Sequence, residues 1–203
     1  MFIELPITAR AKALRKPLYG RGINDAAYMT SMTVHNKQIR CPYYAAWLKM
    51  FTRCYSKSSL TQHPSYIGCS VSKEWYVFSV FRQWMQIQNW EGNALDKDIL
   101  KVGNKLYSPA TCCFVPSAIN TLISKTTKTK GPYPIGVTLN KSTGKYISSL
   151  SIQGKTQHLG TFTSADDAHT KYVESRKEYI KQIASTLPIH IKKGLHIHAD
   201  NLV

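Results

Sequence analysis

The chain has 203 residues, and its 43% hydrophobic and 11% aromatic content is enough for a packed core, which excludes a wholly disordered protein. The formal net charge of +16 comes from both halves, with 15 Lys and Arg against 6 Asp and Glu in residues 1–121 and 12 against 5 in residues 122–203. A polyanion such as nucleic acid is the simplest partner for this charge. The chain has no run of about 18 apolar residues and no apolar leader near its start, so we expect no membrane partner and an intracellular protein.

Residues 1–40 are predicted to form a basic N-terminal arm. Pro6 and Pro17 allow at most a short helix between them. Two interpretations stay open, an arm that lies on phosphates and a solvated tail. The basic residues near its start are Arg10, Lys12, Arg15 and Lys16.

Two amphipathic helices are predicted next. The first starts at Pro42, a residue suited to the first helical position, and runs to about residue 56. The second covers residues 73–90 with Ser72 as its N-cap, and its broad apolar stripe indicates a core face rather than a platform for nucleic-acid bases. The stripe consists of Trp75, Phe78, Phe81, Trp84, Met85 and Ile87.

The segment "LDKDILKVGNKLYSPATCCFVPSAIN", residues 95–120, predicts a strand, a turn, a second strand and a helix. Gly103 and Asn104 supply the turn, and Pro116 and Ser117 are typical of a helix start. Residues 41–123 are therefore expected to form one module. A basic linker is predicted over residues 124–134, because that stretch is rich in Lys, Gly and Pro.

Residues 135–186 predict three short strands followed by one helix, which begins with a capping box made by Ser164 and Asp167. The helix would cover one face of the sheet and leave the other face open to a partner. Residues 187–203 are expected to form a hairpin or tail. The pair His196 and His198 in this segment is interpreted as exposed polar positions rather than as a metal site.

The five cysteines are an odd number, which argues against a disulfide framework in a reducing compartment. Four of them could be drawn together around zinc, but they contain no pair with the C-x₂-C spacing of such sites, so a structural zinc ion is not expected. These four are Cys41, Cys54, Cys69 and Cys112.

Residues 41–122, and the segment 95–120 in particular, resemble the HNH segment of phage-type homing endonucleases. The resemblance implies a ββα-metal (His-Me finger) hairpin and helix around a divalent ion, Mg²⁺ or Mn²⁺ if the chain is catalytic. By position it makes Asp96 and Asn120 metal ligands and Asn104 the residue that props the hairpin. Lys97 stands where the family has its general-base histidine, and a lysine is a cation at neutral pH and a poor base. Asp98 is the candidate to replace that base.

The stretch "GVTLNKSTGKYISSLSIQGKTQHLGTFTSADDAHTKY" resembles the DNA-binding domain of plant ethylene response factors (apetala type) over residues 132–184. The resemblance implies that the open sheet face lies in the major groove of duplex DNA. By matching position, that face consists of Thr138, Asn140, Ser149, Ser151, Thr156 and His158. Phosphate contacts are expected from strand-end and linker lysines, namely Lys141, Lys145, Lys155, Lys125, Lys128 and Lys130.

The expected fold class is α+β, with an N-terminal helical ββα-metal-like module and a C-terminal three-stranded antiparallel sheet packed on one helix. The expected function is that of a DNA-binding protein of the phage HNH homing-endonuclease type, with metal-dependent nicking of duplex DNA as its possible activity. Two alternatives stay open. One is a catalytically inactive DNA-binding protein that keeps the HNH-like core as a scaffold, and the other is a phage protein that binds a host protein. A phage-encoded chain would act in the host cytoplasm.

Overall fold

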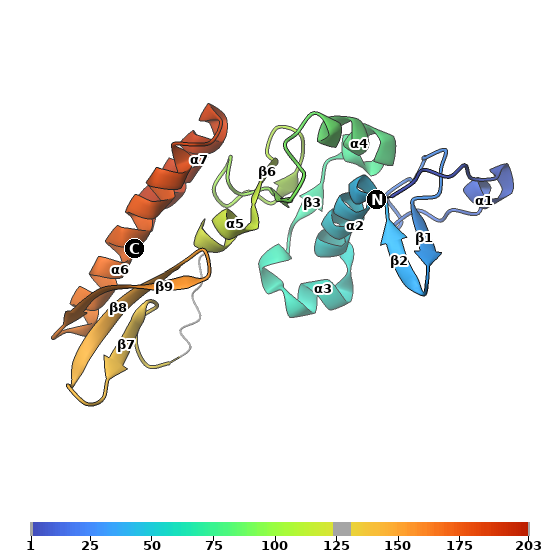
Figure 1. Ribbon diagram of the computed structural model, residues 1–203. Coiled ribbons are helices and arrows are strands. Elements are labelled where there is room, and N and C mark those ends of the chain that lie inside the picture. The colour runs from blue at the N-terminus through green and yellow to red at the C-terminus, as the bar shows by residue number, and fades with distance from the viewer. Residues whose placement is uncertain (1, 124–130, 203) are drawn as a thin grey trace. The chain divides into compact units, whose positions relative to one another are not determined.

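The computed structural model describes residues 2–123 and 131–202. The fold is mixed α+β, as predicted (Figure 1). The chain divides into two compact units, Met1–Phe114 and Val115–Val203, which are described separately below. The predicted module ranges stay predictions, and most of the predicted linker lies outside the described residues.

The first unit consists of short helices and small sheets. Strands β1 and β2 form an antiparallel hairpin, β3 pairs with β5 in parallel, and β4 pairs with β6. The helices are α1 (Ala9–Ala13), α2 (Pro42–Tyr55), α3 (Lys57–Gln62) and α4 (Phe78–Gln86), with 3₁₀ turns η1 (Pro64–Tyr66) and η2 (Lys73–Tyr76). The strands are β1 (Ser31–Val34), β2 (Lys37–Arg40), β3 (Ser70–Val71), β4 (Asn93–Asp96), β5 (Leu106–Tyr107) and β6 (Cys113–Pro116).

Aromatic side chains from α2, η2 and α4 build the core of this unit. Trp47 and Phe51 lie one turn apart on the predicted helix α2, and their ring centroids are 4.7 Å apart. The indole N–H of Trp47 donates to the carbonyl oxygen of Trp75 at 2.7 Å, so the polar atom of this buried ring is satisfied. The predicted aromatic stripe is therefore core, except for Ile87, which is 82% exposed.

The single helix predicted over residues 73–90 is wrong, because Val77 interrupts it with an extended backbone. Ile23 forms a parallel bridge with Val77 there. The backbone N–H of Ile23 donates to the carbonyl oxygen of Tyr76 at 2.7 Å, and the N–H of Phe78 donates to the carbonyl oxygen of Ile23 at 3.0 Å. The N-terminal segment thus forms hydrogen bonds with backbone groups that a continuous helix would have bonded internally. The two shorter elements η2 and α4 form in place of that helix.

The N-terminal segment contains the short helix expected between Pro6 and Pro17, but it also packs into the first unit. The guanidinium group of Arg15 donates to the carbonyl oxygens of Ala26 and Tyr28, both at 2.6 Å. A Cβ atom on Gly22 would lie 2.7 Å from the Trp47 ring. Arg15, one of the basic residues of the predicted arm, therefore helps to hold the fold together.

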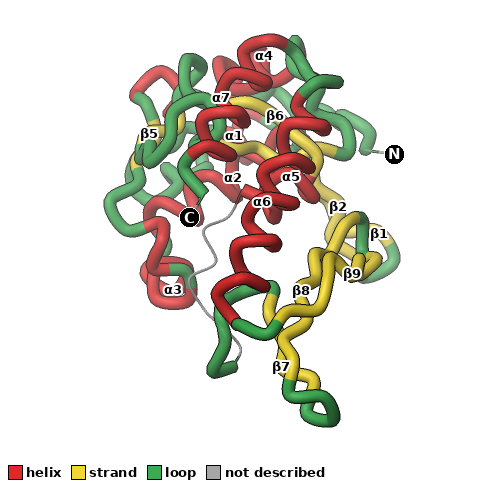
Figure 2. The backbone as a smooth tube through the Cα atoms, turned by 90° about the vertical axis from the view of Figure 1, so that its left-hand side faces the viewer, coloured by secondary structure: helices red, strands yellow, loops and turns green. Residues whose placement is uncertain are grey.

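The second unit contains the predicted antiparallel sheet in the order β7-β8-β9. Gln153 and Gly154 join β8 to β9, and both have positive φ angles, 51° and 77°, as a two-residue hairpin turn requires. Figure 2 shows β8 and β9 (yellow) running together as a hairpin, with the shorter β7 at the edge. The elements are α5 (Ser117–Ile123), β7 (Val137–Asn140), β8 (Lys145–Ile152), β9 (Lys155–Phe162), α6 (Ala165–Ala184) and α7 (Ile189–Asp200).

Helix α6 covers one face of this sheet, as predicted. Its N-cap is Ser164, whose hydroxyl accepts from the backbone N–H groups of Asp166 and Asp167. Tyr172 of α6 lies against Gly136, where a Cβ atom would be only 2.1 Å from the ring. On the strand side of this interface, Ser148 is 0% exposed. The sheet and α6 therefore pack closely, with small residues at the points of nearest approach.

The hairpin predicted for residues 187–203 is wrong, because α7 forms there and packs against α6. Ile191, Leu195 and Ala199 are buried and lie four residues apart, a spacing that places them on one face of a helix. The Ile and His alternation that suggested strands covers only part of this pattern. Neither α7 nor any other helix in the described part of the chain is long and apolar enough to cross a membrane.

The close approach of α6 to the sheet predicts a large cost for Gly136→Ala. The φ angle of Gly136 is +83°, and an added methyl group would overlap the ring of Tyr172. We expect the free energy of unfolding of the full chain to fall by about 3 kcal/mol in a urea titration. The matched control is Gly144→Ala, where φ is +66° with nothing within 4 Å, so only the backbone term of about 1 kcal/mol applies. Equal losses in the two variants would contradict the packing described here.

Candidate nucleic-acid interface

The strand register brings most of the predicted DNA-facing residues onto one surface. Ser149 lies opposite His158, and Ser151 lies opposite Thr156. Thr138 of the edge strand β7 lies opposite Ile147 of β8. Directly paired residues of neighbouring strands share a face, so these positions form cross-strand rows on the sheet. We call this surface the open face, because α6 packs on the other side.

Burial separates the two sides of the sheet. Val137, Ser148 and Leu150 are buried, whereas Thr138, Ser151 and Thr156 are exposed. A bulge at Ser148 and Ser149 shifts the register with β9, but it leaves Ser149 next to His158. The predicted residues of the open face thus present mainly hydroxyl groups and one imidazole.

Two residues of the open face were missed in the sequence, and one predicted residue also has a structural role. Ile147 and Thr161 are paired with each other in the same row as Thr138, a position that strand alternation would have predicted. Asn140 ends β7, and its side-chain oxygen accepts from the N–H and the hydroxyl of Ser142 at 3.1 and 2.6 Å. Asn140 lies two positions after Thr138 on the same strand, so it belongs to the open face and also shapes the turn beside it.

Lysines flank the open face at the ends of the strands. Lys141 lies in the β7–β8 turn, and Lys145 and Lys155 begin β8 and β9; all three are exposed. This arrangement suits phosphate contacts, which position a protein on DNA without reading bases. The linker lysines Lys125, Lys128 and Lys130 lie outside the described residues.

The predicted metal ligand Asp96 ends β4, where its carboxylate accepts two backbone hydrogen bonds. Its Oδ1 atom accepts hydrogen bonds from the backbone N–H of Asp98 at 2.6 Å and from that of Ile99 at 2.8 Å. Burial raises the pKa of this carboxyl group, and the two backbone hydrogen bonds and the nearby Lys97 offset part of the effect. Asp96 therefore holds a turn.

Lys97, at the position of the expected general base, is a buried cation that is only 5% exposed. Its ammonium group donates to the Asp98 carboxylate at 2.7 Å and to the carbonyl oxygen of Asn104 at 2.8 Å. It also lies 6.0 Å from the centre of the Tyr107 ring. The buried ammonium group of Lys97 thus links residues at the two ends of the loop between β4 and β5.

Asn104 fastens the other side of the same loop. Its amide nitrogen donates to the carbonyl oxygens of Lys97 and Leu106 at 2.8 and 2.6 Å, and its oxygen accepts from the N–H of Leu106 at 3.2 Å. Asn120 lies on α5, in the second unit. The predicted ligand pair Asp96 and Asn120 is thus divided between the two units, and its assignment stays a prediction.

These residues do not fit a divalent metal ion. A metal at Asp96 would compete with two backbone N–H groups for Oδ1 and would lie in the loop that holds the Lys97 ammonium, which repels it. Asp98 is the ion-pair partner of that ammonium. The described residues contain no group of three or more His, Cys, Asp or Glu side chains placed to hold a metal ion. The five cysteines are all buried and free.

When the chain is compared with protein-family models, with curated proteins and with solved structures, no match is found. The two family resemblances therefore rest on the residues quoted for them above.

The raised pKa of Asp96 predicts opposite effects for two substitutions. Asp96→Asn keeps an oxygen for the two N–H groups and removes a buried charge, so stability at pH 7 should equal or exceed that of the wild type. Asp96→Ala leaves both N–H groups without an acceptor and should lower the free energy of unfolding by about 2 kcal/mol.

The pH dependence of stability gives the control for this prediction. A carboxyl group whose pKa is raised in the folded state stabilises the fold at low pH and loses that contribution as the pH rises from the unfolded pKa, about 3.9, through the folded pKa. The advantage of Asp96→Asn over the wild type should therefore grow across this range in urea titrations. If Mg²⁺ instead stabilised the wild type and not Asp96→Asn, Asp96 would be a metal ligand.

Proposed function

We propose that this chain is a non-catalytic DNA-binding protein that places the open face of the β7-β8-β9 sheet on duplex DNA with little selectivity for base sequence. The HNH-like segment acts as a structural part of the first unit. This function requires a location where duplex DNA is present, which agrees with the expected intracellular protein.

The charge distribution around the sheet is the observation that carries this proposal. Residues 135–163 include all three strands, and they contain three lysines and no Asp or Glu. The acidic residues of the unit lie on the helices, Asp166, Asp167, Glu174 and Glu178 on α6 and Asp200 at the end of α7. The open face therefore contains no carboxylate that would repel phosphates, and the lysines lie at the ends of its strands.

The side chains on the open face support weak base selectivity. Arginine can bond guanine through two hydrogen bonds, whereas Ser and Thr bond to several bases. Arg176 is the single arginine in residues 115–203, and it is buried. Its Nε donates to the carbonyl oxygen of Leu122 at 2.8 Å, so this guanidinium group joins α6 to the end of α5. Affinity is then expected to come mainly from phosphates.

The loop around Lys97 favours the inactive alternative over nicking. A general base must accept a proton, and the ammonium group of Lys97 already donates to Asp98 and Asn104. Asp98, the candidate to replace it, is the partner in this ion pair. The same contacts that make the loop stable thus occupy both candidates for the base.

Binding to duplex DNA should depend steeply on salt. If about eight phosphates are neutralised, log K should fall against log salt with a slope of about −7. Ser151→Glu and Thr156→Glu add a carboxylate to the open face and should weaken binding at least about tenfold in a fluorescence-anisotropy titration. The matched control is Thr170→Glu on the exposed side of α6, which makes the same charge change and should bind like the wild type.

Two outcomes would decide against this interface. A salt-independent affinity would favour the alternative in which the chain binds a host protein and uses its charge for solubility. Equal losses in Ser151→Glu and Thr170→Glu would mean that total charge, rather than the open face, governs binding.

Supercoiled plasmid tests the absence of catalysis. With Mg²⁺ or Mn²⁺ present, we expect no more nicked circles on agarose gels than in a sample without protein, because Lys97 cannot take a proton while it holds the loop. Nicking that requires the cation and disappears in Asp96→Ala, with DNA binding retained, would establish cleavage and overturn the non-catalytic part of the proposal.

A further inference from the structure

Four basic side chains surround a cavity of about 580 Å³ in the first unit: Arg40 from the end of β2, Lys49 and Arg53 from α2, and His63 after α3. The other residues that line the cavity are all uncharged: Ala45, Leu48, Thr52, Ser59 and Tyr66. The described lining thus contains three Arg or Lys side chains, one histidine and no carboxylate.

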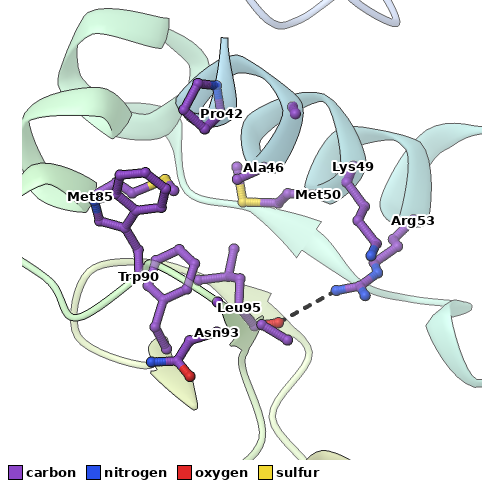
Figure 3. Close-up of a pocket in the computed structure, with 13 residues that line it drawn as sticks. Pro42, Ala46, Lys49, Met50, Arg53, Met85, Trp90, Asn93 and Leu95 are labelled. Atoms are coloured by element: carbon purple, nitrogen blue, oxygen red, sulfur yellow. Dashed lines mark hydrogen bonds between the residues drawn. The ribbon is translucent and has the colours of Figure 1, made fainter. Parts of the chain in front are cut away.

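Arg53 is the fixed member of this group. Its guanidinium carbon lies 5.3 Å from the centre of the Tyr66 ring, and Nη1 makes a long contact of 3.5 Å with the carbonyl oxygen of Leu95. Figure 3 shows this contact and shows Lys49 and Arg53 projecting from the same side of α2. The two side chains also line a neighbouring, more apolar cavity of about 290 Å³ that contains Trp90.

The positive charges of this group are not neutralised by ion pairs in the described part of the first unit. The ion pairs there join Arg82 to Glu4 and Lys97 to Asp98. Lys49 and Arg53 are four residues apart on α2, a spacing at which like charges repel each other and destabilise the helix. Asp96 is the carboxylate that acts on Arg53, and it already accepts two backbone hydrogen bonds. A bound anion would relieve this repulsion.

We propose that this cavity binds a phosphate group. Arginine presents a planar pair of donors that matches phosphate oxygens, and lysine adds a point charge. A volume of about 580 Å³ lies within the range of small-molecule sites, so the cavity can take more than an isolated ion. The phosphate belongs either to the backbone of DNA or to a free nucleotide. Only the DNA source rests on the proposed function.

Inorganic phosphate tests the site without DNA. We expect the Nε–Hε signal of Arg53 in ¹H–¹⁵N NMR spectra of the full chain to shift saturably with added phosphate at constant ionic strength. Lys49→Gln should weaken the apparent affinity about threefold, since one exposed charge is lost. Lys73→Gln is the control, because Lys73 is exposed and lines neither cavity. Lys49 is itself exposed, so this substitution leaves the core intact.

Duplex DNA identifies the source of the phosphate. If the cavity holds a backbone phosphate, Lys49→Gln should reduce the slope of log K against log salt by about 0.9 in magnitude, and Lys73→Gln should not. A free nucleotide is identified by a different pair of results. Phosphate shifts the Arg53 signal while Lys49→Gln leaves the slope of log K against log salt unchanged, and adenosine monophosphate binds more tightly than inorganic phosphate.

An unshifted Arg53 signal in the wild type, or equal effects of Lys49→Gln and Lys73→Gln on phosphate binding, would overturn the site. Failure of the proposed open-face interface would give a different set of results from failure of the phosphate site. In that case the Glu variants of the sheet bind DNA like the wild type, while the phosphate titration of Arg53 is unaffected.

Discussion

The close packing of α6 on one side of a three-stranded sheet is the constraint on which the second unit depends. Val137, Ser148 and Leu150 are buried beneath the helix, and Gly136 leaves room for the ring of Tyr172. Because one helix covers one face, the polar residues of the other face are left exposed. An exposed polar sheet face thus follows from the way in which the unit forms its core.

The loop between β4 and β5 shows how a charged side chain can hold a backbone in shape. The Lys97 ammonium group bonds across the loop to Asn104, while the Asn104 amide bonds back to the carbonyl oxygen of Lys97. A divalent ion would organise a loop of this kind through carboxylates, and here an ammonium group supplies the central positive charge. The loop can therefore form without a metal ion. The side chains of Lys97, Asp98 and Asn104, which were predicted to be catalytic, hold the loop together.

Local patterns predicted most of the second unit and missed what depends on contacts between distant segments. The family resemblance assigned Thr138, Ser149 and Ser151 to one surface, which strand alternation supports, and the capping residue Ser164 marked the start of α6. The break at Val77 was missed because it arises from pairing with Ile23, more than fifty residues away. One of the two partners of Lys97 is the carbonyl oxygen of Asn104, and a backbone group has no side-chain signature in a sequence. Similarly, α7 was mistaken for strands because an alternation of Ile and His also contains the four-residue spacing of a helix.

The burial of the cysteines has a practical consequence for chemistry at the protein surface. All five thiols are enclosed, and burial raises the pKa values of Cys54, Cys112 and Cys113 to about 12. The thiolate is the form that attacks alkylating reagents, so the native chain presents little of it to maleimides at neutral pH. A single cysteine introduced at an exposed position of the sheet would then be the one reactive thiol, and it would accept a fluorophore without removal of the natural cysteines.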